Sequence, residues 1–150
     1  MDELIQLFNA NRVRYLLIGG QALRLEGLPR STMDWDFYIP PKDAENIRKI
    51  NELLAADLDV ALLPLGPGGE NFIQTYQTGF GVIQFHLAVP GLPPFDEAEK
   101  NAVTRRTDRG TPVCCVSGRL LLASKLAANR PQDQLDIEFL REKERLGKLI

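Results

Sequence analysis

The segment from Met33 to Ile39 constrains the fold more than any other part of the chain. Apolar and polar side chains alternate along it in the order Met33, Asp34, Trp35, Asp36, Phe37, Tyr38 and Ile39. Because successive side chains of a strand point to opposite faces, this pattern predicts a half-buried strand with both aspartates on its polar face. Their backbone positions would lie roughly 6–7 Å apart.

Two carboxylates held on a rigid strand can converge on a divalent cation. Mg²⁺ is a hard ion that favours carboxylate oxygens together with substrate phosphates, and Mn²⁺ shares this preference for oxygen ligands. Asp34 and Asp36 are therefore candidate metal ligands. A second interpretation makes them the solvated side of an edge strand, since exposed charges need no ligand. Trp35 and Phe37 argue against it, because they anchor the opposite face of this strand in the core.

Hydrophobic periodicity and breaker residues divide the rest of the chain into elements. Helical spacing predicts helices over residues 4–8, 21–26, 43–56, 95–102, 118–128 and 131–143. Apolar runs predict strands over residues 15–18, 60–63, 103–104 and 113–116, with two more in a hairpin over 73–89. We therefore expect an α/β (α+β) domain, a mixed sheet flanked by helices. It spans 1–150, with a core over about 13–116 and C-terminal helices over 117–146.

Composition excludes several classes of protein. The chain has 150 residues and a formal net charge of −2, which favours one domain and gives no global field for coating a polyanion. One His and two adjacent cysteines, Cys114 and Cys115, do not supply a structural zinc site. No apolar run reaches the length of a membrane span, and the acidic start differs from a signal peptide. We expect a cytoplasmic protein without a membrane partner.

A glycine pair ends the buried run at residues 15–18. Gly19 and Gly20 are followed by Gln21 at the start of a predicted helix. Glycines let a phosphate approach the backbone, and a helix N-terminus offers unpaired N–H groups and the positive end of its dipole. By itself the pair is weak, since tight turns use glycine for steric reasons.

The chain resembles the nucleotidyltransferase superfamily of the DNA polymerase β type at both of its ends. The first resemblance joins the glycine pair to Arg30-Ser31-Thr32 and the Asp34-x-Asp36 strand. The second is Lys125-Leu126 followed by Arg130-x-x-Asp133-x-x-Asp136. The chain is most similar to small prokaryotic members related to AbiEii-type toxins and to minimal nucleotidyltransferases.

This resemblance implies a role for each matching residue. Gly19, Gly20, Gln21, Arg30 and Thr32 would bind the nucleotide. Asp34 and Asp36 would hold Mg²⁺, with Mn²⁺ as the alternative, and metal ions neutralise charge at a reacting phosphoryl group.

From the second segment, Lys125 would approach the triphosphate and Asp136 would complete the motif. Two other interpretations stay open: Arg30 as a salt bridge that fixes a turn, and Lys125 as part of a solvated helix face.

The sequence departs from the family at the third carboxylate. Active members carry an acid on a later strand, where it completes the metal site and helps to activate the acceptor hydroxyl. The matching position holds His86, in Gln84-Phe85-His86. An imidazole can act as a general base near neutral pH. The alternatives are a partly buried strand histidine, or a shifted alignment in which Asp96 or Glu97 supplies the acid.

The resemblance leads to one expected function and two rivals. We expect Mg²⁺-dependent transfer of a nucleoside monophosphate from an NTP to an acceptor hydroxyl on RNA, a protein or a small molecule. Asp34, Asp36, His86 and Lys125 would be the catalytic residues. The first rival is a catalytically degenerate nucleotide-binding or regulatory module, for example with a cognate antitoxin. The second is an interaction protein without a nucleotide site.

Overall fold

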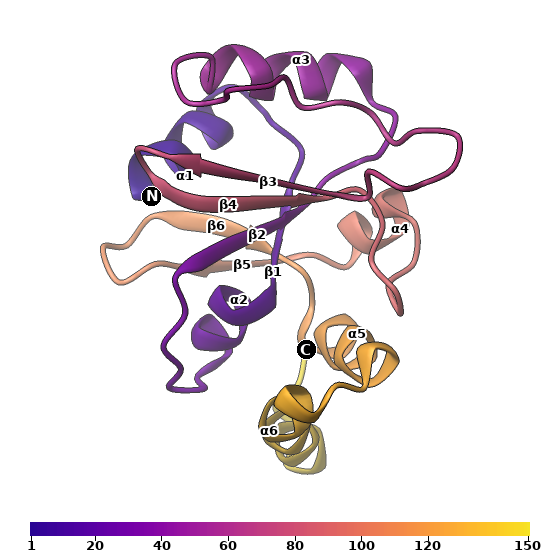
Figure 1. Cartoon of the computed structure of the whole chain (residues 1–150). Coiled ribbons are helices and arrows are strands. Elements are labelled where there is room, and N and C mark those ends of the chain that lie inside the picture. The colour runs from indigo at the N-terminus through magenta and orange to yellow at the C-terminus, as the bar shows by residue number, and fades with distance from the viewer.

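The strand that carries the two aspartates lies in the middle of a six-stranded mixed sheet (Figure 1). The computed structural model describes residues 1–150. Across the sheet the strand order is β3-β4-β2-β1-β6-β5. In chain order the elements are α1 (Asp2–Ala10), β1 (Leu16–Ile18), α2 (Gly19–Glu26), β2 (Asp34–Tyr38), α3 (Ala44–Leu53), β3 (Ile73–Thr78), β4 (Gly81–His86), α4 (Phe95–Lys100), β5 (Val103–Arg106), β6 (Pro112–Cys115), α5 (Gly118–Ala128), a 3-10 turn (Pro131–Asp133) and α6 (Gln134–Arg145). The expected α+β fold is confirmed.

Strand pairing brings distant parts of the sequence together at β2. This strand runs antiparallel to β1, with Asp36 opposite Ile18, and parallel to β4, with Asp36 opposite Gln84. The last pair of the parallel ladder is Tyr38 and His86. The glycine turn that follows β1 and the end of β4 therefore lie on either side of the aspartates.

The predicted apolar face of β2 is buried only toward the end of the strand, at Phe37 and the following Ile39, because Trp35 is half-buried and Met33, before the strand, is 83% exposed. Phe37 is fully buried, and its ring contacts Phe8, Tyr15 and Phe85 with ring centroids 5.6–6.1 Å apart. Figure 1 shows α1 and α3 on one side of the sheet and α2, α5 and α6 on the other. Packing on the first side therefore fixes the strand whose polar face looks toward the second.

The expected strand over residues 60–63 is wrong. Leu62 is buried, but its backbone N–H donates to Asn51 Oδ1 at 2.8 Å and its carbonyl accepts from Asn51 Nδ2 at 3.0 Å. Because an α3 side chain satisfies both backbone groups, this extended segment needs no partner strand. Of this apolar run only Leu62 is buried, whereas Val60 and Leu63 are exposed, and the sequence contained no signal that distinguishes a side-chain partner from a strand.

The helices at the C-terminal end follow the predicted signals. The Ser117 hydroxyl accepts from the N–H of Leu120, which caps α5 as expected. Pro131 opens the 3-10 turn, and α6 then extends to Arg145, two residues beyond the predicted end.

None of the helices combines the length and the apolar character that a membrane crossing requires.

Candidate active site

A cleft of about 440 Å³ lies where β1, β2 and β4 face helix α5. Eight of the residues expected to form a site line it: Gly19, Gly20, Arg30, Thr32, Asp34, Asp36, His86 and Lys125. They come from four separate stretches of the chain. The fold thus gathers both halves of the sequence pattern around one cavity.

The aspartates supply carboxylate oxygens that no protein group occupies. Asp34 makes no side-chain hydrogen bond, whereas Asp36 Oδ1 lies 2.8 Å from His86 Nε2. Both Asp36 and His86 keep about 15% of their side chains exposed. Two carboxylates with free oxygens fit Mg²⁺, which binds through one or two protein carboxylates and takes its other ligands from phosphate and water. No cluster of three or more acidic, His or Cys groups stands ready for a metal.

The glycine turn is shaped by its close approach to β2. Gly19 has φ +71°, and a Cβ on it would lie 2.5 Å from Asp36 Oδ2. A Cβ on Gly20 would lie 3.0 Å from the Thr32 hydroxyl. Helix α2 starts here without a side-chain cap, so its first N–H groups remain available to an anion. A larger residue at Gly19 would push against the aspartate that faces it.

The opposite wall of the cleft is a buried ion network. Lys125 Nζ lies 3.3 Å from both Asp133 Oδ1 and Asp136 Oδ2, and Arg30 donates to Asp136. Asp133 and Asp136 are almost fully buried. Lys125 is buried as well, so the solvated-face interpretation of this residue is wrong. The salt-bridge interpretation of Arg30 is confirmed, although Arg30 also lines the cleft.

Arg130 belongs to the same wall and was not among the expected site residues. Its Nε and Nη2 donate to the two carboxylate oxygens of Asp133 at 2.9 and 3.0 Å. These hydrogen bonds, with a smaller contribution from Lys125, lower the pKa of Asp133 to about 2. Half of the Arg130 side chain remains exposed at the cleft. Its place in the Arg-x-x-Asp-x-x-Asp pattern was the signal that could have found it.

Two further expectations concern residues outside the cleft. Gln21 is buried, and its Nε2 donates to the Thr32 carbonyl at 3.3 Å, so it supports the turn from behind. Asp136 lies behind Lys125 rather than on the surface of the cleft.

The shifted alignment is not supported by the cleft. Neither Asp96 nor Glu97 lines it, since both belong to α4, where Asp96 pairs with Arg14. Of the three candidates for the third position, only His86 lines the cleft, beside Gln84, which the expectation omitted.

Known structures share this arrangement of sheet and helices. The lincosamide antibiotic adenylyltransferase LnuA, solved with lincomycin bound, matches 93% of this chain and 92% of its own at 16% identity and a TM-score of 0.58. ANT(2'')-Ia in complex with adenylyl-2''-tobramycin matches 93% and 86% at 15% identity and a TM-score of 0.56. The chain has a nucleotidyltransferase fold.

A third similar structure is an antigenic nucleotidyltransferase-like protein from Paracoccidioides brasiliensis. It matches 93% of this chain and 72% of its own at 17% identity and a TM-score of 0.55. By sequence, no protein family and no curated protein matches the chain. The similarity to known structures is thus one of fold, and the expected relation to AbiEii-type toxins stays a prediction.

Proposed function

We propose that the chain is a nucleotidyltransferase that moves a nucleoside monophosphate from an NTP to a hydroxyl of a small molecule. The observation that carries this proposal is a single cleft in which free oxygens of Asp34 and Asp36 face an uncapped helix start and two arginines. Anionic phosphates are stabilised by helix N–H groups and by arginine forks. Carboxylates on the other side suit the cation that accompanies them.

Each wall has a separate task in this proposal. The N–H groups at Gly19 and Gly20 and the exposed parts of Arg30 and Arg130 bind phosphate oxygens and orient the α-phosphorus. Asp34 and Asp36 hold Mg²⁺ or Mn²⁺. When bound, such an ion neutralises charge on the phosphoryl oxygens. Lys125 does not need to reach the nucleotide, because its ammonium neutralises the two buried aspartates that support Arg30 and Arg130.

His86 is the proposed general base. The imidazole Nε2 faces Asp36, which leaves Nδ1 as the nitrogen that can accept a proton. In the reaction the acceptor oxygen forms a bond to the α-phosphorus, the bond to the bridging oxygen breaks, and pyrophosphate leaves. The hydroxyl proton passes to His86 Nδ1. A positioned general base contributes about 10²-fold or more to a rate, so His86→Ala should lower transfer by at least that factor while nucleotide still binds.

Small molecules are favoured as acceptors because two similar structures contain such compounds. LnuA is described with lincomycin bound, and ANT(2'')-Ia with adenylyl-2''-tobramycin. Incubation of this protein with Mg²⁺, ATP and either compound, followed by mass spectrometry, tests the transfer directly. A mass increase of one adenylyl group is the expected product. RNA and protein hydroxyls serve as the comparison acceptors.

The cleft itself can be tested without knowing the acceptor. Each of the four common ribonucleoside triphosphates is titrated with Mg²⁺ into the wild type by calorimetry, and then into the double variant Asp34→Asn, Asp36→Asn. The wild type should bind at least one, and the double variant should show no measurable binding. Asp108→Asn, an exposed acid outside the cleft, is the matched control and should bind as the wild type does. Nucleotide binding that survives the double change would overturn the proposal.

One observation favours a second candidate function, a nucleotide-binding module without turnover. His86 occupies the position at which the resemblance leads us to expect a third acid. The variant His86→Asp separates the two candidates. A lower rate of transfer supports the enzyme with a histidine base, whereas transfer that appears or rises at least tenfold indicates a protein that has lost catalysis.

A further inference from the structure

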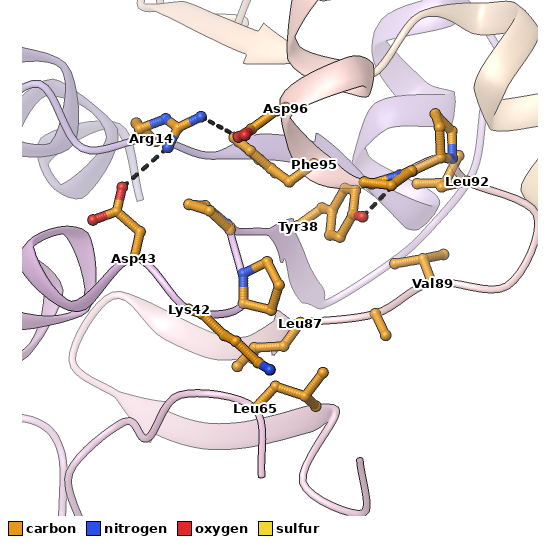
Figure 2. Close-up of a pocket in the computed structure, with 15 residues that line it drawn as sticks. Arg14, Tyr38, Lys42, Asp43, Leu65, Leu87, Val89, Leu92, Phe95 and Asp96 are labelled. Carbon is orange, nitrogen blue, oxygen red and sulfur yellow. Dashed lines mark hydrogen bonds and ion pairs between the residues drawn. The ribbon is translucent and has the colours of Figure 1, made fainter. Parts of the chain in front are cut away.

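A second cavity, of about 680 Å³, opens beyond the ends of β2 and β4 (Figure 2). These two strands run parallel and end at Tyr38 and His86, which are paired in register. Ligands of open sheets bind outside the carboxyl ends of parallel strands. Val89 lines both this cavity and the cleft of the aspartates. A molecule bound here would therefore lie next to the site at which the nucleotide is proposed to react.

The walls of this cavity are mainly apolar. Figure 2 shows Leu65, Leu87, Val89 and Leu92 around it, and four prolines contribute to the lining. The volume falls within the range of about 300–1,000 Å³ that is typical of sites for small molecules. Such walls fit an apolar ring or chain, and they offer few partners to a compound that is polar on all sides.

The carboxylates at its edge are already paired. Arg14 donates to Asp43 at 3.0 Å, to Asp96 at 2.6 Å and to Glu99 at 2.8 Å. The Arg14 guanidinium also lies 5.2 Å from the centre of the Phe95 ring. Lys42 is exposed, lines the cavity and forms no ion pair, so the one unpaired charge here is positive. A polycation would find no free acid, and because the apolar walls disfavour a buried charge, a ligand with an uncharged body fits best.

The segment between the two cavities is held in place from both sides. The Tyr38 hydroxyl donates to the Pro93 carbonyl at 2.9 Å, and the N–H of Leu92 donates to the Val89 carbonyl at 3.1 Å. Gly91 has φ +85°, and a Cβ on it would lie 2.6 Å from the Ala123 carbonyl oxygen of α5. The wall therefore exists before any ligand binds, which lowers the cost of binding.

From these observations we infer that this cavity is the acceptor subsite and that it selects uncharged alcohols with an apolar body. The inference rests on the proposed function. The apolar part of the acceptor fills the space between Leu65, Leu87 and Leu92. Its hydroxyl-bearing part passes Val89 toward the cleft, where it meets the α-phosphorus and His86.

Phenyl β-D-glucoside is a suitable probe, because it joins an apolar ring to several hydroxyls without charge. Amide chemical shifts of the labelled protein map its site. We expect shifts at Leu65, Leu87, Val89 and Leu92, and much smaller shifts with glucose or with spermine at the same concentration. Equal or larger chemical-shift changes with spermine would overturn the selection for uncharged ligands. Changes with phenyl β-D-glucoside at residues away from this cavity would overturn the location of the site.

Ala88→Phe fills the cavity from an exposed position, so the fold should tolerate it. We expect at least tenfold weaker binding of phenyl β-D-glucoside. The matched control is Ala56→Phe, which adds the same side chain at an exposed position away from both cavities and should bind as the wild type does. Undiminished binding to Ala88→Phe would contradict the assignment of the probe to this cavity.

A paramagnetic ion separates the acceptor role from simple binding. With Mn²⁺ and the nucleotide that binds most tightly, the NMR signals of the probe's sugar protons should broaden more than those of its phenyl protons. Mg²⁺ should cause no such broadening. If the nucleotide binds and the NMR signals of the probe stay sharp, the acceptor role is wrong and the proposed function stands. If no nucleotide binds in the separate titration, the proposed function fails and the acceptor role fails with it.

Discussion

The two walls of the cleft use their charged groups differently. On the strand side, Asp34 has no hydrogen-bond partner and Asp36 has one, His86, through a single oxygen. On the helix side, Asp133 and Asp136 are almost fully buried, and both contact Lys125. The aspartates of the strand wall have unused bonding capacity, whereas those of the helix wall have almost none.

This difference indicates which carboxylates are available for binding a ligand and which contribute to the stability of the fold. Carboxylates with free oxygens repel each other and add little to the fold, so we expect their role to be the binding of a ligand. Buried and paired charges are costly to separate, because removing one partner leaves the other without compensation. We therefore expect the buried part of the helix wall to hold the shape of the cleft, and the strand wall together with the exposed parts of Arg30 and Arg130 to bind ligand.

The strongest test of this difference between the walls is to remove Lys125, the buried cation of the helix wall. Lys125→Met leaves Asp133 paired with Arg130 and Asp136 paired with Arg30 but removes the ammonium between the two buried carboxylates. We expect it to lower the free energy of unfolding by about 3 kcal/mol, the low end for a broken buried ion pair. Urea denaturation at neutral pH measures this. Lys100→Met, at an exposed position without an ion pair, is the control and should change the midpoint little.

The double variant of Asp34 and Asp36 should give the opposite result in the same assay, with unchanged or slightly raised stability. If Lys125→Met were as stable as the wild type, or if the double variant were strongly destabilised, the division between the two walls would be wrong.

Acid titration provides a second and smaller test. The pKa of Asp133 is lowered from 3.8 to about 2 because Arg130 donates to its carboxylate, with Lys125 close by. A lowered carboxyl pKa stabilises the fold above its ordinary value, and this contribution is lost as the pH falls from about 4 to about 2. It amounts to about 2 kcal/mol. The stability of Asp133→Asn should therefore decline less steeply over this window, as urea midpoints at several pH values would report. If the urea midpoints of the wild type and of Asp133→Asn fell in parallel with pH, Asp133 would be excluded as the titrating group.

The smallest effect is expected for ion pairs far from the cleft. On α3, Arg48 pairs with Glu45 and Glu52, and all three side chains are more than half exposed. Solvent and salt screen such pairs, so each contributes little. We expect Arg48→Ala to leave the urea midpoint unchanged within error and to be insensitive to added salt. A clear loss of stability would show that pairing alone, without burial, distinguishes stabilising charges in this protein.

The sequence predicted those parts of the site that depend on local pattern. Alternation placed both aspartates on one strand face, and the glycine pair marked the turn opposite them. The role of Lys125 depends on which groups the chain after α5 brings against it, and periodicity does not report such a contact, whereas the Arg130–Asp133 pair is local and follows the Arg-x-x-Asp spacing. For the same reason Gln21, which follows the glycines directly, gave no sign that its side chain supports Thr32 from behind.

The close contact of Gly91 with α5 limits how this protein can acquire a new preference among acceptors. The segment from Val89 to Leu92 has no room to follow another path, because any side chain at Gly91 would collide with the backbone of Ala123. Selection can therefore act on side chains that line the proposed acceptor cavity, above all at Ala88 and Leu92, while the course of the segment stays fixed. Libraries randomised at these two positions should change the preferred acceptor and leave the nucleotide cleft, which Val89 also lines, intact.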